Sequence, residues 1–360
     1  MKVATSIALG LEASPKLAAK AVAVAMQKAG ITTANSVLLF LTSEFAREPM
    51  PAIKAAAKTA NCLQVMGCSA TGIFTEEDWV LDTPAAAAMV FGDEVSLQSA
   101  KFNDTLQPLF TLTAPNAINS IWLNDGNKRF GGVSGDAIGQ GPFSVWQNAK
   151  GNVTGYVDAY FTNVNVATKA SHGLKNFTKP KKIHQVNGYD ITLLDRKPPL
   201  AALKKAWKTY SKSNDALPLH LIMATYANRA QEIITGEYNQ TSVISYDEVN
   251  GHVTLAQPVA TGQFLSWGFR DKITAEADLL LASTVLTKAL GATPDFGLLI
   301  SCLGRGPYFY DGVDRDLKIL THQFPKMPLL GFYGNGEIAS VNGENQLLPY
   351  SAVLSLFAKK

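Results

Sequence analysis

The stretch "VLLFLTSEF" (residues 37–45) and the later stretch "VMGCSATGIF" (residues 65–74) decide the fold class. The uncharged runs "SVLLFL" (36–41) and "CLQVMG" (62–67) predict two strands, and the first is typical of a strand buried on both faces. The alanine-rich segment between them, residues 50–60, predicts a helix. Because strand, helix and strand follow one another so closely, we expect a βαβ unit with two parallel strands and a right-handed crossover.

The same order of elements is predicted near the other end of the chain. "GLLISCLGRG" (297–306) is followed by a helical segment (312–324) and then by "LLGFYGNGEI" (329–338). The sequence therefore predicts an α/β protein of two related units with mixed sheets and βαβ elements. Ligands of open α/β sheets bind beyond the carboxyl ends of strands. We expect the polar turns after these strands to meet in a cleft between the units.

The basic, proline-containing region around residues 175–200 is the best candidate for a boundary between domains. We predict one domain over residues 1–195 and a second over residues 196–360. Within the first, residues 118–125 ("INSIWLND") favour a strand. Within the second, the Asn250–Gly251 pair predicts the turn of a hairpin over residues 242–259, since Asn-Gly is a strong turn signal.

Composition and charge exclude several classes of protein. The chain has 360 residues, of which 47% are hydrophobic and 17% charged, so it can bury a large core. Its 32 basic and 29 acidic residues are mixed, which gives no reason to expect nucleic acid binding. Since no segment resembles a membrane span or a secretory signal, and three cysteines form no disulfide framework, we expect a cytoplasmic protein without membrane insertion.

The familiar cofactor and metal patterns are missing. "GNGEIA" (334–339) resembles a dinucleotide-binding turn, but the residues after it form a poor helix. The five histidines are scattered, and Cys62 and Cys68 lie six residues apart, which does not suit a zinc site. We therefore predict neither a metal nor a cofactor.

Two cysteines at the ends of predicted strands, Cys68 and Cys302, have two open interpretations. Cysteine is among the most buried residue types, which favours thiols that line a pocket or the core. Arg305, three residues after Cys302, could instead lower the pKa of that thiol. A nucleophile would also need a base, and no histidine is close in sequence.

Arg305 and Glu337 stand in glycine-rich turns directly after predicted strands. An arginine can bind the carboxylate of a ligand through two hydrogen bonds, and a glutamate can bind an ammonium group. The neighbouring glycines would allow backbone N–H groups to approach the ligand. A pocket lined by both charges would suit a zwitterion such as an amino acid. The alternative is that the two side chains pair with other charges of the protein.

At these residues the chain resembles the FIST family of sensory domains. The N-terminal half resembles FIST N through "VLLFLTSEF", "VMGCSATGIF" and "FGGVSGDA" (130–137). The C-terminal half resembles FIST C through "YANRA", "FLSWGFRD", "LLISCLGRGPYF" and "LLGFYGNGEI", in the order typical of the family. The resemblance implies a FIST N-like domain over residues 1–195 and a FIST C-like domain over residues 196–360. It covers nearly the whole chain.

The resemblance implies an intracellular sensor that binds amino acids or similar small molecules. The candidate ligand-binding residues are Cys68, Ser69, Gly132, Cys302, Arg305, Gly331 and Glu337. Two features depart from the family: the segment before the Gly-Gly turn is short, and no acidic residue follows Ala70 within the next five positions. No output domain accompanies the pattern, so we expect a separate signalling partner. The alternative function is a cysteine-dependent enzyme for acyl transfer or hydrolysis that uses Cys302 or Cys68.

Overall fold

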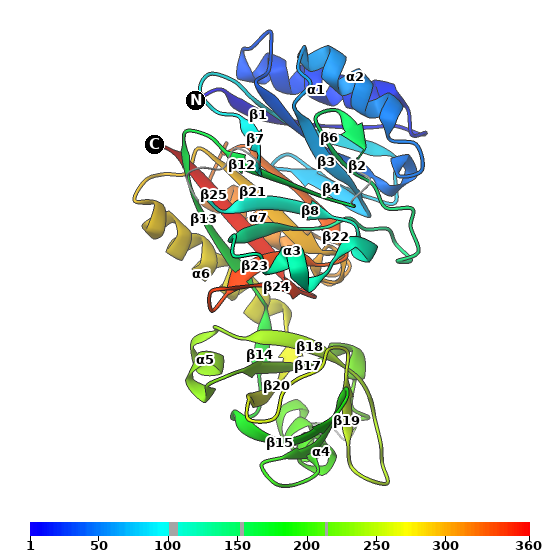
Figure 1. The fold of residues 1–360 in the computed structure, drawn as a ribbon, viewed down its shortest axis with the longest axis vertical. Coiled ribbons are helices and arrows are strands. Elements are labelled where there is room, and N and C mark those ends of the chain that lie inside the picture. Colours follow the sequence, from blue (N-terminus) through cyan, green and yellow to red (C-terminus); the bar gives the residue numbers. More distant parts are fainter. Residues whose placement is uncertain (101–106, 152–154, 213–214) are drawn as a thin grey trace. The chain divides into compact units, whose positions relative to one another are not determined.

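A computed structural model describes residues 1–100, 107–151, 155–212 and 215–360 of the chain (Figure 1). The described residues form two compact units. Unit 1 consists of Met1–His172 and Asp278–Lys360, and unit 2 consists of Gly173–Ala277. Unit 2 is therefore an insertion in the chain of unit 1. No helix among the described residues is long and apolar enough to cross a membrane.

The compact units do not follow the predicted division at residue 195. Strand β13 (Val164–Ser171) pairs along its whole length with the last strand, β25 (Ala352–Lys359). This pairing joins a strand before residue 195 to one near the end of the chain, so the folding units cannot be cut there. The expected α/β class with mixed sheets is confirmed, since unit 1 combines parallel and antiparallel strand pairs with helices.

Sheet A of unit 1 contains six strands with one parallel pair, β2 and β3. Its order is β1 (Val3–Leu9), β6 (Ala85–Phe91), β2 (Ser36–Thr42), β3 (Val65–Ala70), β10 (Val145–Gln147) and β11 (Lys150–Gly151). Helices α1 (Pro15–Ala29) and α2 (Met50–Ala60) cover one face, and η1 (Ser43–Phe45) follows β2 (Figure 1). The Ser14 hydroxyl caps α1 at its start, and Gly30 ends it in the left-handed conformation with φ 64°. The predicted βαβ unit is thus confirmed.

Sheet B has the same arrangement, with β21 and β22 as its parallel pair. Its order is β13, β25, β21 (Phe296–Cys302), β22 (Leu329–Gly334), β4 (Gly72–Thr75) and β5 (Trp79–Leu81). Leucines of α6 (Lys272–Leu290) and α7 (Arg315–Gln323) pack on one face, and η5 (Leu303–Arg305) follows β21. The predicted likeness between residues 37–74 and residues 297–338 is therefore confirmed, since both segments form a parallel strand pair in a mixed sheet.

Sheet C is a third version of this arrangement, which we did not predict as a complete unit. Its order is β7 (Leu97–Ser99), β12 (Tyr156–Phe161), β8 (Leu109–Thr113), β9 (Arg129–Val133), β23 (Glu337–Val341) and β24 (Glu344–Leu348), with β8 and β9 parallel. Two short helices, η3 (Pro115–Ala117) and α3 (Ser120–Leu123), connect β8 to β9.

The prediction of a strand over residues 118–125 was wrong, because the middle of this segment, Ser120–Leu123, forms α3. The Asn119 side chain accepts hydrogen bonds from the backbone N–H groups of Ile121 and Trp122, at 3.1 and 3.3 Å, and so starts a helix. Trp122 and Leu123 then pack against Ile338. A local cap and the packing of two apolar side chains on Ile338 thus outweigh the β propensity of this segment.

Each of the three sheets contains a hairpin from another repeat of the chain. Repeat I runs from β1 to β6, repeat II from β7 to β12, and repeat III from β13 to β25 with unit 2 inserted. The hairpin β4–β5 of repeat I pairs with β22 of repeat III. The hairpin β23–β24 of repeat III pairs with β9 of repeat II, and β10–β11 of repeat II pairs with β3 of repeat I. The exchange closes a cycle, which ties the three repeats into one unit.

Three glycines occupy the same place in the three parallel pairs. Gly67 lies opposite Leu39, Gly131 opposite Thr111, and Gly331 opposite Leu299. A Cβ atom at these glycines would lie 1.7, 1.9 and 2.1 Å from the carbonyl oxygen of the opposite residue. No side chain fits there, so each glycine is required by the close approach of two backbones.

A cycle of three backbone hydrogen bonds joins the repeats where β3, β9 and β22 end. The N–H of Thr71 donates to the carbonyl of Tyr333 at 3.1 Å, and the N–H of Asn335 donates to that of Val133 at 3.1 Å. The N–H of Gly135 completes the cycle by donating to Ser69 at 3.4 Å. The stretch "GCSATGIF" is therefore mostly strand: β3 ends at Ala70 and β4 begins at Gly72.

The inner faces of the three sheets enclose one apolar core. Phe40 of sheet A, Phe110 of sheet C and Phe332 of sheet B all belong to it, and each is fully buried. The rings of Phe40 and Phe332 meet edge to face, with centroids 4.8 Å apart. Gly132 makes room for Phe332, because a Cβ atom at Gly132 would lie 3.0 Å from its ring.

Unit 2 is an antiparallel sheet with its own apolar core. Its strands are β14 (Leu174–Asn176), β15 (Lys181–Asn187), β16 (Asp190–Leu194), β17 (Ile222–Ala227), β18 (Asn239–Tyr246), β19 (Val253–Leu255) and β20 (Phe264–Arg270). An additional pairing of β17 with β20 closes the strands from β15 to β20 into a ring, and β14 pairs with β20 outside it. The helices are α4 (Pro199–Ser211), η4 (Leu219–Leu221) and α5 (Ala230–Thr235). The predicted hairpin at Asn250–Gly251 is confirmed, since Tyr246 pairs with Val253.

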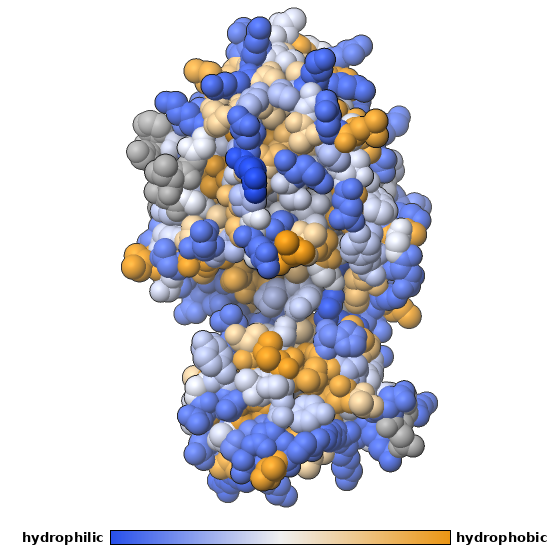
Figure 2. All heavy atoms as spheres, turned by 90° about the vertical axis from the view of Figure 1, so that its right-hand side faces the viewer, coloured by the Kyte–Doolittle hydropathy of each residue, from blue (hydrophilic) through white to orange (hydrophobic). Residues whose placement is uncertain are grey.

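The surface mixes hydrophilic and apolar side chains. Figure 2 shows apolar residues scattered among hydrophilic ones on the face it presents. Several of the most exposed large apolar side chains, such as Leu63, Ile121 and Val249, come from different parts of the chain. Scattered exposed apolar residues are normal for globular proteins, so exposure alone does not indicate a binding surface at these three positions.

Candidate ligand-binding site

Two of the predicted site residues, Cys68 and Gly331, have clear packing roles. Cys68 points into the apolar core, and its burial raises the pKa of the thiol well above the usual value. A reactive cysteine needs the opposite shift, so this environment does not favour Cys68 as a nucleophile. Gly331 lies under the ring of Phe74, whose Cζ would be 2.2 Å from an added Cβ atom.

Ser69 holds together the place where the repeats meet. Its hydroxyl lies 3.0 Å from the hydroxyl of Ser134 and accepts a hydrogen bond from the backbone N–H of Ser144 at 3.0 Å. Ser134 in turn donates to the backbone carbonyl of Ser69 at 2.6 Å. These contacts connect the ends of β3 and β9. These hydrogen bonds satisfy the Ser69 hydroxyl without a ligand, so a structural role accounts for a serine at this position.

Arg305 is buried beside an acidic partner. It lies in η5 directly after β21, and only 1% of its surface is exposed. Its Nε atom donates to Asp316 Oδ2 at 2.8 Å and Nη2 donates to Asp316 Oδ1 at 3.2 Å. Its Nη1 atom donates to the carbonyl of Ser171 at 2.6 Å. Burial is the largest single influence and would lower the pKa of the guanidinium, but the charge and hydrogen bonds of Asp316, together with Tyr310 and Asp278, raise it.

A second acidic side chain stands beside this ion pair. Asp314 caps α7 by accepting the N–H of Leu317 at 2.8 Å, and it also accepts the hydroxyl of Tyr333. Burial, together with the charge of Asp316, raises the pKa of Asp314 to about 6. The N-terminus of α7 thus places two carboxylates on one side of Arg305. The sequence "VDRDL" (313–317) contains both and could have suggested acidic partners for the arginine.

Glu337 is the unusual residue of this region. It is fully buried at the start of β23, opposite Gly132. Its Oε2 atom accepts the backbone N–H of Ser351 at 3.2 Å, whereas its Oε1 atom has no hydrogen-bond partner in the described part of the chain. Burial raises the pKa of this carboxyl well above its usual value, against the hydrogen bond from Ser351 and the charge of Arg305.

The cyclic arrangement of the repeats shows how exceptional Glu337 is. The hairpin strands β4, β10 and β23 each pair with the third strand of another repeat. In these registers, Glu337 takes the place that Ile73 and Val145 take in the other two hairpins, and both of those residues belong to the apolar core. Because a buried carboxylate is costly, folding alone does not explain an acid at this position.

His172 and Ser351 complete the group, and the sequence did not suggest either. The Nδ1 atom of His172 lies 3.3 Å from the hydroxyl of Ser351, and its backbone N–H donates to Asp278 Oδ2 at 2.7 Å. Burial lowers the pKa of His172 to about 4, against the charge of Asp278. The N–H of Cys302 donates to the carbonyl of Ser351 at 3.0 Å. Cys302, a predicted site residue, therefore also lies beside Ser351, which directly precedes β25.

We call this group the buried polar cluster. It lies in unit 1 beyond the ends of β13 and β21 and contains Ser171, His172, Asp278, Cys302, Arg305, Asp314, Asp316, Glu337 and Ser351. The structure thus gathers three predicted residues, Cys302, Arg305 and Glu337, and places Gly132 next to them. In the described part of the chain, no group of three or more His, Cys, Asp or Glu side chains could hold a metal ion.

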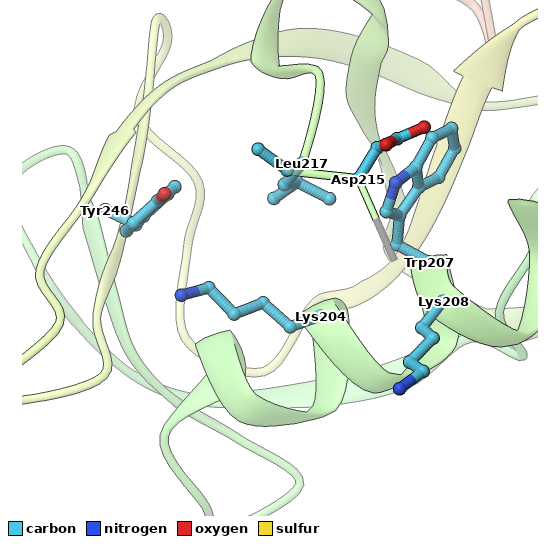
Figure 3. Close-up of a pocket in the computed structure, with 7 residues that line it drawn as sticks. Lys204, Trp207, Lys208, Asp215, Leu217 and Tyr246 are labelled. Carbon is cyan, nitrogen blue, oxygen red and sulfur yellow. The ribbon is translucent and has the colours of Figure 1, made fainter. Parts of the chain in front are cut away.

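Two pockets lie away from this cluster. One of about 310 Å³ is next to α4 in unit 2 (Figure 3), and one of about 470 Å³ lies between β13 and the end of α6 in unit 1. Neither is lined by Arg305 or Glu337. The predicted cleft between two units is not among the features that the structure establishes.

Comparison with known proteins agrees with the resemblance in the C-terminal part of the chain. Residues 200–340 match the model of the FIST C domain, from α4 to β23. This part of the chain is therefore a FIST C domain, which indicates a sensory role in signal transduction. The FIST N-like character of residues 1–195 stays a prediction.

Relatives extend the similarity over the whole chain. The uncharacterized protein Rv0628c of Mycobacterium tuberculosis (strain H37Rv) is 24% identical over 382 residues, which cover 98% of this chain and 99% of that protein. The uncharacterized protein Mb0898c of Mycobacterium bovis is 24% identical over 229 residues, or 63% of this chain and 59% of that protein. Neither name states a ligand or an activity.

Proposed function

We propose that this protein is a sensor of a small zwitterion or carboxylic acid with an amino group, such as an amino acid, and that the ligand binds at the buried polar cluster. The observation that carries the proposal is the Oε1 atom of Glu337, which is fully buried and accepts no hydrogen bond from any described residue. Buried polar atoms without partners are rare in folded proteins and often mark functional sites. An ammonium group would supply the missing donor.

The charges of the cluster support a ligand of this kind. An ammonium ion next to Glu337 would favour the ionised carboxylate, which burial otherwise disfavours. Binding would therefore release a proton from Glu337. Arg305 contributes the only arginine side chain in the cluster, and its guanidinium already binds Asp316 and Ser171. A ligand carboxylate would have to share the guanidinium with these two partners.

A FIST C domain without a catalytic pattern supports sensing over catalysis. The raised pKa of Cys68 does not favour the cysteine-dependent alternative at that residue. A sensor also requires a partner that transmits the signal, and we propose a separate signalling protein for this role.

Thermal unfolding in the presence of amino acids tests the proposal. We expect one or more free amino acids to raise the unfolding midpoint, since a ligand at 100 times its Kd stabilises the native state by about 2.7 kcal/mol. The N-acetyl form of the same amino acid lacks the ammonium group and should give no shift. Calorimetric titration in buffers of different ionisation enthalpy should show the release of a proton.

The decisive variant is Glu337→Gln, which keeps the shape of the side chain and removes the charge. We expect it to abolish the midpoint shift. Glu344→Gln is the matched control, because Glu344 is an exposed acid on β24 of the same hairpin and should leave binding unchanged. Unchanged amino acid binding by Glu337→Gln would overturn the proposed site, and the absence of any shift in the wild type would overturn the proposed ligand class.

A further inference from the structure

A pocket in unit 2 forms a second potential binding site with different chemistry. It lies between α4, the segment 215–217 and the end of β18, and has a volume of about 310 Å³. Its lining includes Lys204, Trp207, Lys208, Asp215, Leu217 and Tyr246 (Figure 3). We call it the α4 pocket. Its volume is at the lower end of the range for small-molecule sites.

Trp207 forms a rigid wall of the α4 pocket. The buried face of α4 packs into the core of unit 2 through Leu203 and Trp207. The indole ring is held by Phe269, with centroids 5.1 Å apart, and by Phe177, with centroids 5.9 Å apart. A ring fixed on two sides by aromatic neighbours keeps its orientation, so its edge is presented to the pocket in a defined geometry.

The indole N–H of Trp207 is buried and has no hydrogen-bond partner among the residues that the structure describes. Only 9% of the residue is exposed, and Figure 3 shows the ring nitrogen on the side of the other labelled pocket residues. Buried tryptophans normally find an acceptor for this group, and indole can only donate. The matching group must therefore be an acceptor, such as a carboxylate or carbonyl oxygen.

The charges and the flat surfaces of the α4 pocket indicate which class of ligand it would bind. Lys204 pairs with Glu248 and lies over the ring of Tyr246, with Nζ 4.8 Å from the centroid. Its ammonium group is thus held near the pocket, where it would favour an anion. Leu217 and Tyr246 supply apolar surface between which a flat ligand could lie. Asp215 also lines the pocket, and Lys208 extends away from the other labelled side chains (Figure 3).

We propose that the α4 pocket binds a small carboxylate with a flat or apolar body. One carboxylate oxygen accepts the N–H of Trp207, the charge of Lys204 favours the anion, and the body packs against Tyr246 and Leu217. This site is independent of the buried polar cluster, since all of its lining residues belong to unit 2. The protein would then bind a carboxylate in unit 2, in addition to the ligand proposed for the buried polar cluster of unit 1.

Titration of the full chain with sodium benzoate and sodium phenylacetate, followed by the indole N–H signals in NMR spectra, tests this inference. The signal of Trp207, identified by its loss in Trp207→Phe, should move and saturate. Lys204→Met should weaken binding by about tenfold to a hundredfold, as expected for loss of a charge-assisted contact. Lys205→Met is the matched control, because Lys205 lies on the same helix, is exposed and does not line the pocket.

Each outcome decides the inference. Saturation by benzoate but weaker binding of the neutral isostere benzamide supports a carboxylate site. If benzoate and phenylacetate leave the Trp207 signal unchanged at millimolar concentration, the pocket holds only water and the inference fails. Equal weakening by Lys204→Met and Lys205→Met would also overturn it, because it would indicate a general charge effect. Glu337→Gln should not change benzoate binding, which separates this result from the test of the proposed function.

Discussion

At the scale of single residues, the buried polar cluster combines satisfied and unsatisfied groups. Arg305 donates hydrogen bonds to the Asp316 carboxylate and to the carbonyl of Ser171, which accounts for its burial by ordinary ion pairing. Glu337 is different because one of its oxygens has no hydrogen-bond partner among the described residues. Burial of such an oxygen costs stability and adds no contact that stabilises the fold. Glu337 is therefore a better marker of function than Arg305.

The pH dependence of stability should reveal the buried His172. Its pKa in the native protein is lowered to about 4 from the usual 6.5, so the folded state resists protonation. The stabilising contribution is present above pH 6.5 and is lost as the pH falls through 4. The total loss is on the order of 3 kcal/mol, since one pKa unit corresponds to about 1.4 kcal/mol.

Urea unfolding of the wild type and of His172→Asn between pH 7 and pH 4 measures this contribution. The variant should lose less stability than the wild type over this range. His220→Asn is the control, because His220 is exposed and should follow the wild type. The raised pKa of Asp314 acts in the opposite direction but is common to all three proteins. Parallel curves for wild type and His172→Asn would show that His172 is not buried as described.

At the scale of elements, the close approach of two backbones in each parallel strand pair leaves no room for a side chain at one position. That position is occupied by the glycine opposite Leu39, Thr111 or Leu299. Gly331 is a predicted ligand-binding residue, and the structure gives it a second explanation through its contact with Phe74.

Gly331→Ala should destabilise unit 1 by about 3 kcal/mol or more, because the new methyl group would overlap a backbone carbonyl and an aromatic ring. Equilibrium unfolding in urea measures the loss. Gly151→Ala is the matched control, since no described atom lies within 4 Å of an added Cβ atom there. A destabilisation of Gly331→Ala no larger than that of Gly151→Ala would contradict the packing role and favour a role in binding alone.

At the scale of the whole molecule, the chain leaves unit 1 after His172 and returns at Asp278. These two points are adjacent, because the Asp278 carboxylate accepts the N–H of His172 at 2.7 Å and the hydroxyl of Ser171 at 2.9 Å. The insertion of unit 2 therefore leaves β13 and β25 paired, and sheet B does not depend on inserted residues for its six strands.

Replacement of residues 174–276 by a short glycine-serine linker should leave unit 1 folded. We expect a single cooperative thermal transition and a near-UV circular dichroism signal from its packed aromatic residues. A fragment of residues 1–195 is the comparison and should not fold, since it lacks β21, β22 and β25 of sheet B. A cooperative fold of that fragment, or a disordered excised protein, would contradict the assignment of units.

The sequence by itself determined the α/β class, the two βαβ units and the likeness between residues 37–74 and 297–338. Apolar runs, helix caps and turn residues are local signals, and local propensities and packing agree at these places. It also singled out Arg305 and Glu337, because charges directly after buried strands are conspicuous. The segment 118–125 escaped prediction because its cap and its contact with Ile338 outweigh its β propensity.

Only the tertiary structure decided how these parts combine. The exchange of hairpins among three repeats, the insertion of unit 2 and the pairing of β13 with β25 depend on contacts between residues far apart in the chain. The same long-range contacts bring His172, Arg305 and Ser351 to Glu337 and leave one of its oxygens without a hydrogen-bond partner in the part of the chain that is described. Burial and hydrogen bonding belong to the folded arrangement, so no local pattern could have predicted them.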